Sequence, residues 1–272
     1  MSYLFDPANW EWLFGGPWLR FLLYGFFTNL EIAIIAMALS LAFGLSLALL
    51  ALSKTRWIAR VARTWIDVWR NLPLIFVILY VFITMPETVK DWYGRVVPGF
   101  FPEAFDSPAV LAAVIALTLY NSAVIAEIMR AGIVSLEKGQ GEAASALGLP
   151  YWKAMRLIIL PQGLRRMVPA TVSQLITLNK DTTLVSIITV QEVMRRGRIV
   201  TNTAGNPFAD PGGTPAPLLM VFLVIGLMFI IVNFGLSRLS RRLEIRERKR
   251  TGTKVEGPSG LEDQVALDAD VA

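Results

Sequence analysis

The sequence contains neither cysteine nor histidine among its 272 residues. Without cysteine the chain can form no disulfide bond and no thiolate metal site, and it offers no thiol nucleophile. Without histidine it lacks the side chain that most often serves as a general base or a metal ligand. A catalytic triad that needs histidine and a histidine-ligated zinc site are therefore excluded, and we expect neither catalytic residues nor a bound metal.

Charged side chains are also scarce. They make up 17% of the sequence, against about 25% in a typical soluble domain, whereas 54% of the residues are hydrophobic. The mean hydropathy is +0.53. Because the charges cluster near the ends of the chain and between apolar runs, the composition fits a bilayer better than water. We predict an all-α protein that crosses the membrane several times.

Long apolar runs mark the candidate spans, since a hydrocarbon core of about 30 Å needs about 20 residues of helix. Five segments qualify: 21–52, 58–85, 108–131, 169–190 and 217–236. The fourth is polar for a lipid-facing helix. Together they define a transmembrane domain over 21–245, preceded by an extracytoplasmic segment, 1–20. The polar tail that follows, 246–272, has a composition typical of disorder.

Lysine and arginine gather on one side of the predicted bundle. The segments that follow the first, third and fifth spans contain seventeen of these residues, whereas the segment 191–216 contains three. Short cytoplasmic connections carry an excess of positive charge in membrane proteins. We therefore predict that the N-terminus lies outside and that the C-terminus lies in the cytoplasm.

The connection between the third and fourth spans, 132–168, is too long for a turn. It contains two helix-compatible stretches, 142–146 and 152–160, separated by a Gly-Leu-Pro break at 148–150. The second stretch is expected to end at Pro161. This small amphipathic element could rest on the membrane surface, or it could be a docking surface for a cytoplasmic partner.

One set of residues in this connection has a distinctive spacing: Glu142, Ala143, Ala144, Gly148, Ile158, Leu160 and Pro161. The spacing resembles the cytoplasmic signature of bacterial binding-protein-dependent importers. The resemblance implies the permease fold of a type I ATP-binding-cassette (ABC) importer, in which the element 139–161 forms coupling helices seated in a cleft of an ATPase subunit. Small side chains permit such close seating, although alanine next to glutamate also simply favours a helix.

Other stretches resemble one branch of that family, the polar amino acid permeases. They are 68–74 (Val-Trp-Arg-Asn-Leu-Pro-Leu), 127–133 (Glu-Ile-Met-Arg-Ala-Gly-Ile), 161–169 and 180–186 (Lys-Asp-Thr-Thr-Leu-Val-Ser). The resemblance implies a subunit in the bacterial cell membrane that forms half of a translocation path. Its partners would be an ATPase dimer, a second permease (identical or related), an extracytoplasmic amino-acid-binding protein and the amino acid, with no nucleic acid.

The chain contains no Walker A sequence, so the resemblance places ATP and Mg²⁺ on the partner ATPase and no cofactor in this chain. The details look most like permeases for glutamate and aspartate, while glutamine or other polar amino acids remain alternatives. A secondary transporter is a more distant alternative, because such proteins usually show internal repeats, and none is visible here.

The fourth predicted span carries a polar stripe. Its members fall on one face of a helix: Ser173, Gln174, Thr177, Lys180 and Asp181. Such a stripe would be costly against lipid, so it is expected to point inward. It could line the translocation path and meet the substrate, or it could only hold the bundle together.

Two further places interrupt the apolar runs. Glu127 and Arg130 lie three residues apart and could pair on one helix face. Arg70 and Pro73 interrupt the second span, where Pro73 removes a backbone donor and favours a kink. For these four residues we expect a gating or structural role.

Overall fold

A computed structural model of the chain describes residues 5–96, 103–136, 138–206, 210 and 212–251. The described residues form helices joined by short loops, and no strand occurs among them. The longer helices are α3 (Trp18–Ala51), α4 (Arg56–Asn71), α5 (Leu74–Thr84), α6 (Glu87–Val96), α7 (Pro108–Val134), α8 (Lys138–Ala146), α10 (Leu160–Asp181), α11 (Val193–Thr203) and α12 (Leu218–Thr251). Short elements are η1 (Pro7–Trp10), α2 (Glu11–Phe14), η2 (Glu103–Asp106), α9 (Tyr151–Ala154), the π-helical η3 (Met155–Ile159) and η4 (Thr182–Ile188).

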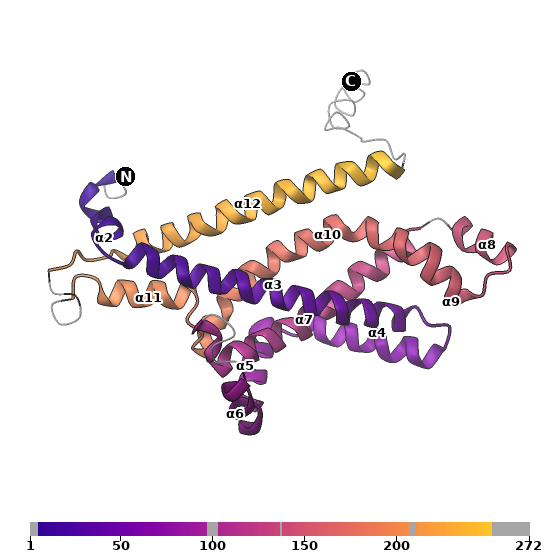
Figure 1. The fold of residues 1–272 in the computed structure, drawn as a ribbon, viewed down its shortest axis with the longest axis horizontal. Helices are drawn as coiled ribbons and strands as arrows, with labels where there is room; N and C mark the ends of the chain where they lie inside the picture. Colours follow the sequence, from indigo (N-terminus) through magenta and orange to yellow (C-terminus); the bar gives the residue numbers. More distant parts are fainter. Residues whose placement is uncertain (1–4, 97–102, 137, 207–209, 211, 252–272) are drawn as a thin grey trace, which may run out of the picture.

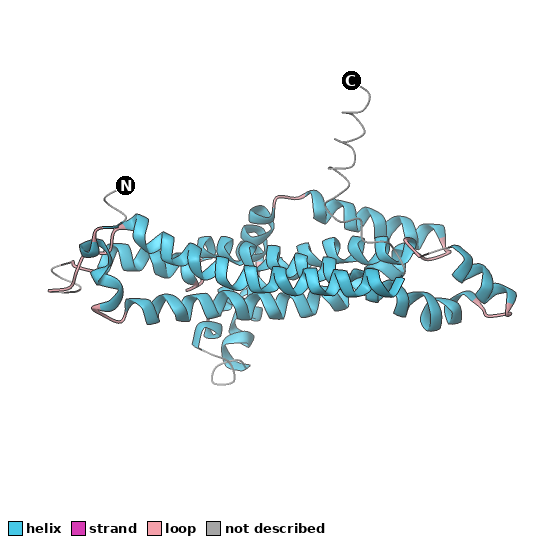
Figure 2. Ribbon diagram, turned by 90° about the horizontal axis from the view of Figure 1, so that it is seen from above, coloured by secondary structure: helices cyan, strands magenta, loops and turns pink. Residues whose placement is uncertain are grey.

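Most of the helices lie along one long axis and form an elongated bundle, from which α5 and α6 project (Figures 1 and 2). Helices α2 and α11 lie at one end of this axis, and α8 and α9 lie at the other. The prediction of an all-α membrane protein is confirmed, because the described residues are helical and the long helices are strongly apolar.

Helix α7 forms the centre of the packing and contacts α3, α4, α5 and α10. Its contact with α3 depends on small side chains. A Cβ atom added at Gly44 of α3 would lie 2.7 Å from Ile125 Cγ2 and 2.9 Å from the backbone oxygen of Ser122 on α7. Small residues allow two apolar helices to approach closely, which compensates for the weak hydrophobic driving force inside a bilayer.

The predicted second span, 58–85, is not one continuous helix. Helices α4 and α5 meet at an angle of 101°. Leu72 is extended and Pro73 precedes the first residue of α5, because the proline ring disfavours a helical conformation for the residue before it and proline has no backbone donor. The chain therefore breaks into two helices at Pro73, where the sequence predicted only a kink within one helix.

The predicted fourth span, 169–190, also differs from the structure. Helix α10 begins at Leu160 and continues from α9 through the π-helical turn η3, so Pro161 does not end the helix. The wider π turn accommodates a residue that cannot donate a backbone hydrogen bond. At the other end, α10 stops at Asp181, and η4 follows it to Ile188.

By length and apolarity, the described residues support three or four of the five predicted spans. Among the described residues, α3, α7 and α12 are long and apolar enough to cross a membrane, and the bent pair α4–α5 makes a fourth candidate. Helix α10 does not qualify because its polar face lowers its hydropathy. Helix α12 also extends to residue 251, so the first part of the tail predicted to be disordered is helical. Residues 252–272 lie outside the described part.

Candidate functional site

The signature element, which we define as residues 139–161, occupies the end of the molecule opposite α2 (Figure 1). On α8 the side chains of Glu142 and Ala143 are exposed, whereas Ala144 is buried. Gly148, which follows the end of α8 by two residues, has a φ of +73°. Its backbone N–H donates to Ser145 at 2.9 Å, and the N–H of Leu149 donates to Ala144 at 3.0 Å. Glycine suits this left-handed end of a helix because it has no Cβ atom.

The second half of the signature shapes the junction between α9 and α10. Ile158 lies in the π turn, and Leu160 and Pro161 begin α10. Ile158 and Leu160 are half-buried, and Pro161 is exposed. The signature residues thus divide into an exposed pair on α8 and a set that determines how the element joins the bundle.

Tyr151 anchors this element to the corner between α3 and α4. Its hydroxyl donates to the backbone oxygen of Leu52 at 2.9 Å, and the ammonium of Lys54 lies 4.5 Å from the centre of its ring. Burial raises the pKa of Tyr151 above its ordinary value, so the phenol stays protonated and can donate. The sequence contains no local signal for this contact, because the two residues are 99 positions apart.

The polar stripe on α10 divides into two groups. Ser173, Thr177 and Lys180 are exposed, whereas Gln174 and Asp181 are half-buried. The exposed group lies along a single line on the helix, as a helical repeat requires.

Two members of the stripe also connect helices. The side-chain amide of Gln174 donates to Asn121 Oδ1 on α7 at 2.8 Å. The hydroxyl of Ser173 lies 3.1 Å from the hydroxyl of Ser240 on α12. Gln174 and Ser173 thus make contacts between helices, as one of the two alternatives for the stripe expects.

Lys180 differs from these residues. Its side chain is exposed, and the described part of the chain offers its ammonium no carboxylate within ion-pair distance. Thr177 donates only to the backbone of its own helix, to Ser173 at 3.4 Å. Lys180 therefore presents a positive charge on an exposed polar line close to the end of α10.

A buried polar network lies just beyond the stripe, and its residues were not among the expected site residues. Asn29 of α3 donates to Thr182 Oγ1 at 2.9 Å and to Glu192 Oε2 at 3.1 Å, and it accepts from the N–H of Val193 at 3.0 Å. Glu192 is fully buried and caps α11. The network joins α3, η4 and α11 where Thr189 adopts a positive φ of 69°.

Two signals in the sequence point toward this network. Asn29 is a polar residue inside a long apolar run, and such residues in a span usually have a partner. Glu192 precedes a polar helix, where a carboxylate can accept from free N–H groups. Neither signal identifies the partner, because Asn29 and Glu192 are 163 positions apart.

Glu127 and Arg130 form the ion pair that their spacing permits. Arg130 Nε donates to Glu127 Oε2 at 2.8 Å, and Arg130 Nη2 donates to Glu127 Oε1 at 2.7 Å. Arg70 and Asp67 of α4 lie within electrostatic range of the pair. The ion pair of α7 thus lies near two charges of the helix that precedes the break at Pro73.

The family model described as "Binding-protein-dependent transport system inner membrane component" matches residues 40–249. "Probable glutamine ABC transporter permease protein GlnP" of Bacillus subtilis is 35% identical over 230 residues, which cover 84% of this chain and 94% of the relative. "Glutamate/aspartate import permease protein GltK" of Escherichia coli is 31% identical over 243 residues, which cover 88% and 98%.

A solved structure is also similar. "Crystal structure of an amino acid ABC transporter with histidines" matches with a TM-score of 0.66 and 26% sequence identity, covering 84% of this chain and 94% of that chain. The likeness in sequence and in fold extends over most of the described helices. The match to the family model includes the signature element and the polar stripe of α10.

Proposed function

The chain belongs to the family of binding-protein-dependent transport system inner membrane components, as a polar amino acid ABC permease, and from this premise we propose that it imports glutamate and aspartate. It is a transport component of the bacterial inner membrane and passes through that membrane more than once. The observation that carries the substrate proposal is Lys180, a cation on the exposed polar line of α10 that has no carboxylate within ion-pair distance among the described residues.

The charge of Lys180 suits an acidic solute. A carboxylate that leaves water needs a charge-assisted partner, and a lysine ammonium supplies one without any rearrangement of the ion pairs already present. Glutamine is the second candidate, because the glutamine permease of Bacillus subtilis is 35% identical to this chain. Glutamine has no side-chain carboxylate, so it gains less than glutamate or aspartate from the positive charge of Lys180.

We propose that a separate ATPase dimer, which holds ATP and Mg²⁺, docks on the signature element. The exposed Glu142 and Ala143 would contact it, while Gly148, Ala144, Ile158, Leu160 and Pro161 would maintain the shape of the element. Helix α10 supports this assignment, because one helical path runs from α9 through η3 to Lys180. A displacement of α8 and α9 would therefore move the polar stripe.

The exposed polar line of α10 must also be shielded from the hydrocarbon of the bilayer. Ser173, Thr177 and Lys180 would be costly against hydrocarbon. We propose that this line faces a second permease, identical or related, across a hydrated path, and that an extracytoplasmic amino-acid-binding protein delivers the solute from the N-terminal side. In this arrangement the signature element and the end of α12 lie in the cytoplasm.

Uptake of radiolabelled glutamate by cells that lack the chromosomal subunit tests the substrate proposal. We expect Lys180→Gln to lower uptake by about 10-fold to 100-fold, because a hydrogen bond to a charged group contributes roughly 1.5–3 kcal/mol. Lys180→Arg keeps the charge and should retain part of the activity. Unlabelled aspartate should compete better than glutamine or arginine, and better competition by glutamine would overturn the substrate assignment.

The docking proposal has its own measurement. Glu142→Lys should abolish stimulation of the ATPase in the purified complex, while Glu87→Lys, a change at an exposed residue of α6, away from the signature element, should not. An ATPase rate that is indifferent to Glu142→Lys would contradict docking through α8, and it would leave the substrate assignment untouched.

A further inference from the structure

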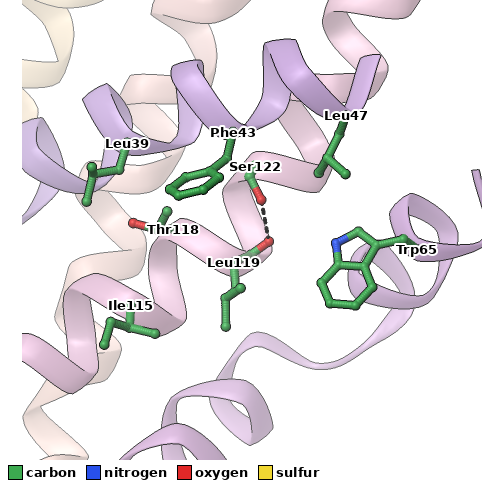
Figure 3. Close-up of a pocket in the computed structure, with 8 residues that line it drawn as sticks. All are labelled: Leu39, Phe43, Leu47, Trp65, Ile115, Thr118, Leu119 and Ser122. Carbon is green, nitrogen blue, oxygen red and sulfur yellow. Dashed lines mark hydrogen bonds between the residues drawn. The ribbon is translucent and has the colours of Figure 1, made fainter. Parts of the chain in front are cut away.

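A continuous apolar groove follows the half of α3 that lies nearer to the signature element. Two cavities of about 410 Å³ each form it, and they share Leu47 and Trp65. Figure 3 shows the walls of one cavity, where side chains of α3 and α7 face Trp65 of α4 across the opening. The other cavity continues along α4 past Val61 to Trp57.

A basic cleft lies on a neighbouring face of α4, near the Trp57 end of the groove, and shares no lining residue with it. It has a volume of about 330 Å³, and its charged lining residues are Lys54, Arg56, Arg60, Arg63 and Asp67. Four cations therefore face one carboxylate. Arg60 connects the cleft to the groove, because its guanidinium carbon lies 4.9 Å from the centre of the Trp57 ring.

These cations have no carboxylate partner in the described part of the chain, where the ion pairs join other residues. Arg63 uses Nε and Nη2 to donate to the backbone oxygen of Ala51, and Lys54 lies over the ring of Tyr151. Arg56 and Arg60 are exposed, and their guanidinium groups take part in no hydrogen bond among the described residues. They are the two cations that remain available to an anion.

We propose that groove and cleft together bind one anionic phospholipid of the leaflet on the side of the signature element. Its acyl chain lies along Leu47 and Trp65, and its phosphate lies between Arg56 and Arg60. Exposed apolar walls favour a hydrocarbon occupant. Basic residues near an anionic lipid surface contribute about 1 kcal/mol each, or about fivefold in binding.

Charge also argues against a second copy of the chain in this groove. Two copies related by a two-fold axis present the same patch to each other. A copy packed on α4 would therefore bring its own four cations toward this cleft, and like charges in contact disfavour the interface. A lipid phosphate supplies the opposite charge.

Quenching of tryptophan fluorescence by brominated lipids tests the proposal. The complete transporter complex is placed in nanodiscs of phosphatidylcholine with a rising fraction of brominated phosphatidylglycerol or brominated phosphatidylcholine. The difference between the wild type and Trp57→Phe/Trp65→Phe isolates the two groove tryptophans. The site variant is Arg56→Gln/Arg60→Gln, and the matched control is Arg241→Gln/Arg242→Gln, two exposed arginines on α12.

We expect phosphatidylglycerol to reach half of its quenching at a mole fraction at least about fivefold lower than phosphatidylcholine. The site variant should reduce this preference to within about twofold, and the control variant should keep it. Inorganic phosphate at constant ionic strength should leave the quenching unchanged.

Four results would overturn the proposal. Equal quenching by both lipids would show that the cleft does not select charge. No quenching of Trp57 and Trp65 would show that protein covers the groove. Loss of the preference in the control variant would indicate a general surface attraction, and displacement by inorganic phosphate would assign the cleft to a soluble anion.

Discussion

Replacing Glu192 with alanine removes a fully buried carboxylate that accepts three hydrogen bonds. The donors are Asn29 Nδ2 at 3.1 Å and the backbone N–H groups of Met194 at 2.9 Å and Arg195 at 2.7 Å. In the variant the first turn of α11 loses its cap. Asn29 keeps Thr182 as a partner, so its amide is not left without an acceptor.

The magnitude follows from these contacts. Loss of an N-cap costs about 0.5–2 kcal/mol. A hydrogen bond to a charged group contributes about 1.5–3 kcal/mol, and the desolvation of the buried carboxylate offsets part of that gain. We therefore expect Glu192→Ala to lower stability by about 2–4 kcal/mol. At roughly 2–4 °C per kcal/mol for a chain of this size, the melting temperature should fall by ~5–15 °C.

The shift in melting temperature is measured by heating the protein in detergent and determining the remaining folded fraction by size-exclusion chromatography. Glu192→Gln keeps one oxygen acceptor and should lose about half as much stability as Glu192→Ala. The matched control is Glu87→Ala, which removes an 80% exposed carboxylate and should change stability by less than about 1 kcal/mol. If Glu192→Ala and Glu87→Ala melt within 2 °C (roughly one kcal/mol) of each other, the network does not hold α3 to α11.

Two further predictions concern helix contacts. Gly44→Ala should separate α3 from α7 and lower the free energy of unfolding by about 1–3 kcal/mol. The control is Gly226→Ala, where an added Cβ meets nothing within 4 Å, and it should be neutral or slightly stabilising. Equal melting temperatures of the two variants would refute the close approach. Tyr151→Phe should cost about 1 kcal/mol and weaken ATPase stimulation. Burial raises the folded-state pKa of Tyr151 above its unfolded value near 10. The contribution of this phenol to stability is therefore complete at lower pH and is lost only as pH rises through the folded pKa. ATPase stimulation by the wild type should accordingly show no step from Tyr151 between about pH 6 and 9.

Local patterns in the sequence determined several features of this protein. Long apolar runs indicated a membrane protein, since a span needs only length and apolarity. The break before α5 follows from Pro73, and the Glu127–Arg130 pair follows from a spacing of three on one helix. The spacing around Gly148 identified the family. Each of these features depends on residues close together in the chain.

The tertiary structure decided the features that depend on distant residues. Asn29 and Glu192 meet across 163 positions, and Gln174 meets Asn121 across 53. The start of α10 at Leu160 required the π turn before it, which hydropathy does not reveal. The polar stripe is one pattern in sequence, yet packing assigns Gln174 and Ser173 to helix contacts and leaves Lys180 exposed. A linear pattern specifies which face is polar, and only the neighbouring helices specify which of its groups remain free.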